Sequence, residues 1–142
     1  MRVDVFCRAC LKRRRVEGFP ASSACACGES ITFAWTDAHR EGKPIAACSA
    51  CQAPNLYIEK DFPASIGCAV MVGAVGAFLY SENLWILLGA AAVDGSLYLV
   101  LPWRTVCYKC LTEYRGWPRN PEHQRYELTT AAQYATSARR PM

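Results

Sequence analysis

Two long runs of apolar residues interrupt a chain that is otherwise polar and basic. Residues 62–80 contain no charged residue, and residues 84–103 contain one, Asp94. At about 1.5 Å of rise per residue, each helix would be as long as the ~30 Å hydrocarbon layer of a membrane is thick. Only residues 81–83 separate the runs, which leaves room for a tight turn. The pattern predicts two transmembrane helices that form an antiparallel hairpin over residues 62–103.

The alternative is a buried helical hairpin in a soluble domain. The rest of a 142-residue chain is too small to cover two twenty-residue apolar helices on all sides. Uncharged runs of this length therefore favour a membrane span.

Asp94 lies near the middle of the second run. A carboxylate at that depth costs at least about 2.5–3.5 kcal/mol, so it must be protonated, paired or in contact with water. We expect a polar contact inside the hairpin or with a partner subunit. The alternatives are a proton or ion relay, and a protonated carboxyl group bonded to Ser96 or to a backbone carbonyl.

The basic residues predict the orientation of the hairpin. The net charge is +4, and all sixteen Lys and Arg lie outside residues 61–103, with Lys60 and Arg104 on either side of the hairpin. Positive charge is concentrated on the cytoplasmic side of membrane proteins. We expect an integral membrane protein, of the bacterial inner membrane or an equivalent one, with cytoplasmic N- and C-termini.

Eight of the nine cysteines form four close pairs, at positions 7/10, 25/27, 48/51 and 107/110. A secreted disulfide scaffold is the alternative to metal binding, but the first seven residues lack the apolar core of a signal peptide. Short repeated pairs match metal-site spacing better than a disulfide framework. The ninth cysteine, Cys68, lies within the first apolar run, where a packing role is expected.

Two pairs complete a four-thiolate shell, for which Zn²⁺ is the usual ion and iron a possible one. Sequential pairing gives a first site of Cys7, Cys10, Cys25 and Cys27, and a second site of Cys48, Cys51, Cys107 and Cys110. Interleaved pairing would instead join the first pair to the third and the second to the fourth. His39 is a potential replacement ligand, although we expect an exposed loop histidine.

The cysteine pairs, as Cys7-Arg-Ala-Cys10 with Cys25-Ala-Cys27-Gly28 and Cys48-Ser-Ala-Cys51 with Cys107-Tyr-Lys-Cys110, resemble the zinc-ribbon (rubredoxin-like) family. The resemblance implies two ribbon-like modules, over residues 1–38 and over 46–61 with 104–117. Short strands are expected near residues 31–35 and 55–59. The second pair departs from the family in having one intervening residue, and only this pair is followed by glycine. The order of ligands also resembles RING domains, but twenty residues separate the second and third pairs, where RING domains have a few.

Two further segments have a distinctive composition. Lys12, Arg13, Arg14 and Arg15 form a basic run expected to contact lipid headgroups or an acidic partner; nucleic acid is the less favoured partner. Residues 120–140 predict a C-terminal helix, with Asn120 as its cap, Pro121 in its first turn and Arg139 and Arg140 at its end.

The predicted fold is a membrane α-helical hairpin inserted into a small β zinc-ribbon-like cytoplasmic head with a C-terminal helix. The sequence contains no catalytic constellation or phosphate-binding loop, and filled four-cysteine sites are structural by default. We expect a non-enzymatic accessory or assembly subunit of a larger membrane complex, with two Zn²⁺ ions, lipids and other membrane subunits as its partners and no small-molecule substrate. The alternatives are electron transfer through a rubredoxin-like iron site and a membrane-anchored RING-like ligase.

Overall fold

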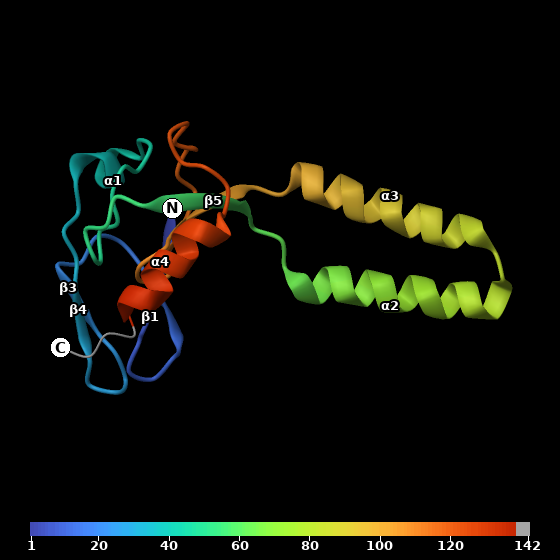
Figure 1. Cartoon of the computed structure of the whole chain (residues 1–142), viewed down its shortest axis with the longest axis horizontal. Coiled ribbons are helices and arrows are strands. Elements are labelled where there is room, and N and C mark those ends of the chain that lie inside the picture. Colours follow the sequence, from blue (N-terminus) through green and yellow to red (C-terminus); the bar gives the residue numbers. More distant parts are fainter. Residues whose placement is uncertain (139–142) are drawn as a thin grey trace. The chain divides into compact units, whose positions relative to one another are not determined.

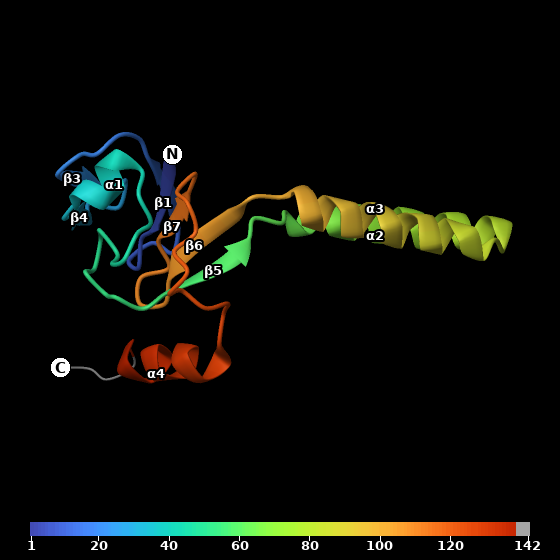
Figure 2. The same cartoon turned by 90° about the horizontal axis from the view of Figure 1, so that it is seen from above.

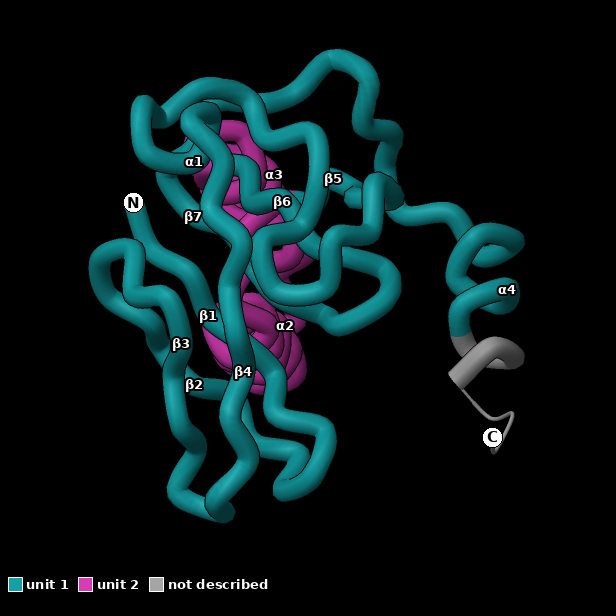
Figure 3. Tube along the Cα trace, turned by 90° about the vertical axis from the view of Figure 1, so that its left-hand side faces the viewer, with its two compact units in different colours: residues 1–59, 103–142 teal, residues 60–102 magenta. Residues whose placement is uncertain are grey.

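A computed structural model describes residues 1–138, which divide into two compact units (Figure 3). The first unit, here called the head, comprises residues 1–59 and the chain from Trp103 onward. The second, here called the hairpin, comprises residues 60–102. The sequence predicted two cysteine modules in the head, but strands from both of them belong to one sheet.

The head contains a five-stranded sheet. Its strands are β1 (Arg2–Phe6), β2 (Arg13–Val16), β5 (Leu56–Lys60), β6 (Trp103–Cys107) and β7 (Glu113–Arg115). They lie in the order β2-β1-β7-β6-β5, the last four of which can be followed in Figure 2. β1 pairs antiparallel with β2 and β7, and β6 pairs antiparallel with β7. Because β5 precedes the hairpin and β6 follows it, the hairpin is inserted between two neighbouring strands.

The two faces of the sheet differ because polar and apolar residues alternate along its strands. Val3 and Val5 are buried on one face, together with Tyr114, which lies opposite Val3. The core also contains Val16, Phe33, Ile45, Leu56 and Trp117. The other face holds Asp4 and, directly opposite it, Glu113. Both carboxylates form ion pairs with arginines, so this face is a polar layer.

A two-stranded sheet, β3 (Ser22–Ala24) with β4 (Ser30–Thr32), and a short helix, α1 (Asp37–Glu41), complete the core. Trp35 follows β4, and its ring stacks on Phe33 at 5.1 Å between centroids. His39 of α1 is 1% exposed and lies edge-on to Trp35. The expectation of an exposed histidine was wrong, because α1 turns this side chain into the core.

The C-terminal segment runs along β5 before it becomes helical. The Ile58 N–H donates to the Gln124 carbonyl at 3.0 Å, and residues 121–127 form turns and one bridge to β5. Helix α4 therefore spans Leu128–Ala138 and begins later than the predicted Pro121. Asn120 accepts the Glu122 N–H in a turn instead of capping the helix. The predicted helix end at Arg139 and Arg140 lies outside the described residues.

Tyrosines connect this C-terminal segment to the loops of the head. The Tyr108 ring lies 4.5 Å from Tyr57, 5.8 Å from Tyr126 and 6.1 Å from Tyr134, measured between centroids. The Asn55 side-chain amide donates to the Tyr134 hydroxyl at 2.7 Å. Aromatic contacts of this kind contribute about 0.5–1.5 kcal/mol each beyond their buried area.

The hairpin is a pair of apolar helices, α2 (Ala64–Ser81) and α3 (Leu84–Val100), which lie side by side (Figure 1). α2 ends at Glu82, which has a left-handed backbone conformation, and Asn83 caps α3 by accepting the Trp85 N–H at 3.0 Å. At the other end, the Lys60 ammonium donates to the Leu101 carbonyl at 2.8 Å. A cation is favourable at this end of α3 because of the helix dipole.

α2, with 18 residues, has the length and composition of a membrane-spanning helix, and Ala74 is its one buried residue. α3 is a shorter apolar helix of 17 residues. It ends before the predicted Trp103 because Pro102 disfavours the helical conformation in the residue before it.

Candidate metal centres

All four cysteine pairs lie in turns closed by the same backbone hydrogen bond. The N–H of the first cysteine donates to a carbonyl just after the turn, from Cys7 to Lys12, Cys48 to Ala53 and Cys107 to Thr112, each at 3.0 Å. The Cys25 turn closes on Glu29 at 2.6 Å. The pair with one intervening residue therefore forms the same type of turn with one residue fewer. We call these turns knuckles.

Each knuckle needs a left-handed residue directly after its second cysteine. Gly28 fills this position in one knuckle, with φ of 91°. In the other three it is filled by Leu11, Gln52 and Leu111, with φ of 57–58°. A side chain in this conformation costs about 1–2 kcal/mol. The left-handed position recurs in all four turns, and three of them accept a strained side chain there, which indicates that the knuckle geometry is held by the surrounding contacts.

We expect Leu11→Gly to stabilise the head by about 0.5–1 kcal/mol, because glycine adopts the left-handed conformation without strain, less its entropic cost in the unfolded chain. Leu11 is 70% exposed, so little packing is lost. Chemical denaturation would measure the change, with Leu11→Ala as control because alanine keeps the strain. Equal effects of the two substitutions would contradict the strain argument.

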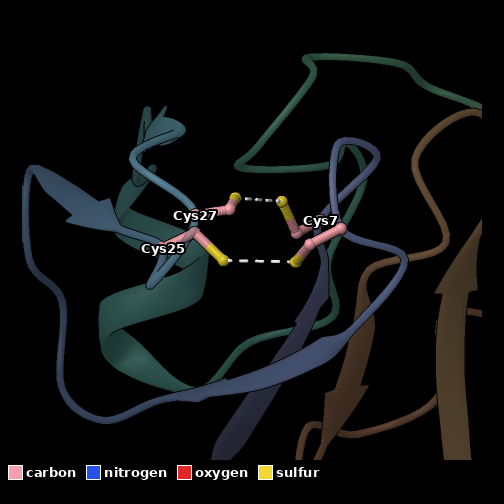
Figure 4. Close-up of side chains that lie close together, drawn as sticks. Cys7, Cys25 and Cys27 are labelled. Carbon is pink, nitrogen blue, oxygen red and sulfur yellow. Dashed lines mark hydrogen bonds between the residues drawn. The ribbon is translucent and has the colours of Figure 1, made fainter.

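The first cluster joins the knuckle between β1 and β2 to the knuckle between β3 and β4. Its sulfurs lie 3.6 Å apart from Cys7 to Cys27 and from Cys10 to Cys25 (Figure 4). Cys7 is buried, whereas Cys27 is exposed. A backbone hydrogen bond from Cys27, followed by thiol hydrogen bonds, lowers the pKa of Cys25 below its ordinary value. The cluster therefore favours a thiolate at Cys25.

The second cluster joins the loop before β5 to the knuckle between β6 and β7. Its sulfurs lie 3.4 Å apart from Cys48 to Cys110 and 3.5 Å from Cys51 to Cys107. Cys48 and Cys107 are completely buried. Hydrogen bonds from Cys107 and then Cys110 lower the pKa of Cys48 well below its ordinary value. Hydrogen bonds with Cys110 and then with Cys48 raise the pKa of Cys107, so the cluster favours a thiolate at Cys48.

A buried tyrosine supports the second cluster from the core side. The Tyr114 oxygen lies 3.3 Å from the Cys48 sulfur and accepts the Ser49 N–H at 2.8 Å. Burial raises the pKa of Tyr114, which keeps the hydroxyl protonated and able to donate to sulfur. Burial lowers the pKa of His39, whose ring centroid lies 5.7 Å from that of Tyr114. Tyr114 was missed by sequence reasoning because only the folded sheet brings it to Cys48.

Both clusters fit a four-coordinate metal ion. Within each one, all four sulfurs lie within 4.8 Å of one another, and the cysteines are free. Sulfurs at ~2.3 Å from a tetrahedral Zn²⁺ would lie roughly 3.8 Å apart, whereas a disulfide requires ~2.05 Å. The grouping is sequential, and the described chain has no interleaved cluster.

The basic run is largely engaged within the head. Arg13 pairs with Glu113, Arg15 lies 3.8 Å from Asp4, and Arg14 donates to the Ser23 carbonyl at 2.8 Å. Because the run forms β2, alternate residues face opposite sides of the sheet. Lys12 is exposed at the end of the knuckle. Sequence reasoning missed these partners because Glu113, Asp4 and Ser23 belong to other strands, which only the fold brings next to β2.

The remaining predicted residues lie in the hairpin. Cys68 is exposed on α2 and belongs to neither cluster. The Asp94 Oδ1 atom on α3 is buried and has no hydrogen-bond partner in the described chain. Ser96 instead donates to the Ala92 carbonyl at 2.8 Å, so it is not a donor to Asp94.

Comparisons with protein-family models, with curated proteins and with solved structures find no match to this chain.

Proposed function

We propose that this chain is a non-enzymatic accessory subunit of a larger membrane complex, with α2 and α3 in the membrane and one Zn²⁺ in each cysteine cluster. The observation that carries the proposal is the hairpin surface. Its exposed side chains are mostly apolar, and the large ones include Leu79, Tyr80 and Val100, which are 72%, 94% and 85% exposed. Water does not tolerate so large an apolar patch, whereas lipid or another membrane helix does.

The charge distribution supports cytoplasmic termini. No basic residue occupies the turn between α2 and α3, and Lys60 and Arg104 lie at the chain positions where the hairpin begins and ends. The positive-inside preference then places the head on the cytoplasmic side. A reducing compartment also keeps eight thiols available for metal.

A structural role for zinc follows from the ligand sets. Four cysteines fill the tetrahedral shell, so neither cluster leaves a position for water or substrate. The same four sulfurs suit iron, for which electron transfer is the corresponding activity. Metal analysis and visible absorbance of the purified chain distinguish the two. Two zinc ions per chain without visible absorbance support a structural role. Visible absorbance from iron would instead support electron transfer.

The test of the accessory role is purification of the tagged chain from its native membrane in a mild detergent. We expect it to elute with partner subunits at a fixed stoichiometry. A stable, uncomplexed monomer would contradict the proposal.

Asp94→Leu is expected to weaken that association by about tenfold. The buried carboxyl oxygen lacks a partner within the described chain, and a polar contact between membrane helices contributes about 0.6–2 kcal/mol. Native gels of solubilised membranes would measure the loss of complex. Ser96→Ala is the matched control, because Ser96 already bonds within its own helix. Unchanged assembly of Asp94→Leu would exclude a contact to a partner.

A further inference from the structure

Two adjoining cavities form a groove across the knuckles of the head. Their volumes are ≈ 480 and ≈ 520 Å³, and Arg8, Cys51 and Lys109 line both of them. We call this the knuckle groove. Each cavity alone falls within the size range of ligand sites. Because they share three lining residues, together they form an elongated site that suits an extended chain better than a compact molecule.

Each end of the groove contains apolar residues. Phe6 and Ile31 line one cavity, and Pro54 and Tyr134 line the other. Glu29 lies in the first cavity and disfavours a second acid at that end. The groove therefore favours an apolar side chain at each end.

The middle of the groove is cationic. Arg8 and Lys109 are exposed and belong to knuckles of different clusters. Neither forms an ion pair with an acidic residue in the described chain, in contrast to the arginines on the charged face of the sheet. The Arg8 guanidinium donates to the Lys109 backbone carbonyl, and both residues line both cavities. A guanidinium has five donors, so further donors remain for a carboxylate.

From this arrangement we infer that the knuckle groove binds an extended acidic segment of a protein partner, with a carboxylate between Arg8 and Lys109 and an apolar side chain in each end cavity. The inference deepens the proposed accessory function and in that respect rests on it. It assigns the contact to the head, in addition to any contact made by the hairpin.

The experiment uses the full chain with its metal in a neutral detergent. Fluorescence anisotropy measures binding of a labelled octapeptide, Gly-Leu-Ser-Glu-Ser-Leu-Ser-Gly, against the same peptide with lysine in place of glutamate. The two leucines and the glutamate lie on one face of this peptide when it is extended. We expect only the glutamate peptide to bind. The double variant Arg8→Gln with Lys109→Gln is expected to weaken binding at least about tenfold, because charge-assisted hydrogen bonds are lost. Lys12→Gln with Arg40→Gln is the matched control, since it removes the same charge outside the groove.

Several results would overturn the inference. Equal weakening by the control variant would indicate general electrostatic attraction, and displacement of the peptide by millimolar inorganic phosphate would indicate a simple anion site. Loss of zinc from the Arg8→Gln, Lys109→Gln variant would show that these cations neutralise the thiolates. If the tagged chain purifies without partners while the octapeptide binds as expected, the accessory function is contradicted, but peptide binding by the knuckle groove is supported. If the complex forms normally in membranes but the octapeptide does not bind the head, only the inference about the knuckle groove is overturned.

Discussion

Cys48→Ser is expected to unfold the head, whereas Cys25→Ser should leave its main sheet folded. Cys48 and its partner Cys107 are completely buried, and the Cys48 sulfur contacts Tyr114 in the core. A structural zinc site contributes about 10–16 kcal/mol of apparent binding free energy, as much as or more than the whole stability of a small domain. Loss of this site also leaves polar sulfur groups buried without a metal.

The first cluster has a more local position. It fastens the β3–β4 sheet to the knuckle after β1, and its Cys27 side chain is exposed. Loss of this metal should release the β3–β4 segment, while the pairing of β1 with β7 and of β6 with β7 remains. Limited proteolysis should then cut near residues 20–32 first.

Thermal unfolding with metal analysis would check both variants. We expect Cys48→Ser to lose cooperative unfolding of the head, and Cys25→Ser to retain one zinc and a transition at lower temperature. Cys68→Ser is the control, because Cys68 lies outside both clusters, and it should match the unaltered protein. Equal damage from the two cluster variants would mean that the shared sheet cannot form without either metal.

The cysteine clusters were predictable from sequence because each close pair forms its own knuckle and the pairs combine in chain order, although the second cluster joins knuckles on either side of the hairpin. The spacing of the pairs favoured sequential sites, and the structure groups the sulfurs in that way. The small β head was also predicted correctly, with strands close to residues 31–35 and 55–59. Of the two predicted spans, α2 alone reaches the length of a membrane candidate.

The fusion of the two cysteine modules was not predictable, because it depends on the pairing of β1 with β7, more than a hundred residues apart. The alternation in Arg2–Phe6 indicated a strand but not its neighbours. In the same way, the basic run Lys12–Arg15 was predicted to contact lipid headgroups or an acidic partner. Its partners Glu113 and Asp4 come from other strands, which composition alone does not reveal.

Glu113→Gln is expected to destabilise the head by about 3 kcal/mol, because Glu113 is a buried carboxylate at the centre of an arginine cluster. Its side chain is 2% exposed and accepts from Arg115 at 2.7 Å and from Arg104 at 3.1 Å. Arg13 of β2 pairs with its other oxygen. Arg104 also donates to Glu59 at 2.7 Å, so the ion pairs around Glu113 reach from β2 to β5.

The expected loss of stability lies near the lower end of the range for breaking a buried ion pair, because the arginines are 20–56% exposed and water screens their charge. Glutamine keeps the shape of the side chain, but it removes the counter-charge of Arg13 and one of the acidic partners of Arg104 and Arg115, which still pair with Glu59 and Asp4. Urea denaturation of the metal-loaded protein would measure the change. The matched control is Glu41→Gln, which removes an exposed pair with Lys43 and should cost less than about 1 kcal/mol.

The position of Glu113 allows a test of whether ion pairs couple the two cysteine clusters of the head. Arg13 belongs to the strand beside the first cluster, and Arg104 belongs to the strand that leads into the second. If Glu113 couples these parts, Glu113→Gln should enlarge the damage caused by Cys25→Ser in a double-mutant cycle. Additive effects of the two substitutions would mean that backbone pairing alone connects the clusters, and that the ion pairs stabilise each strand separately.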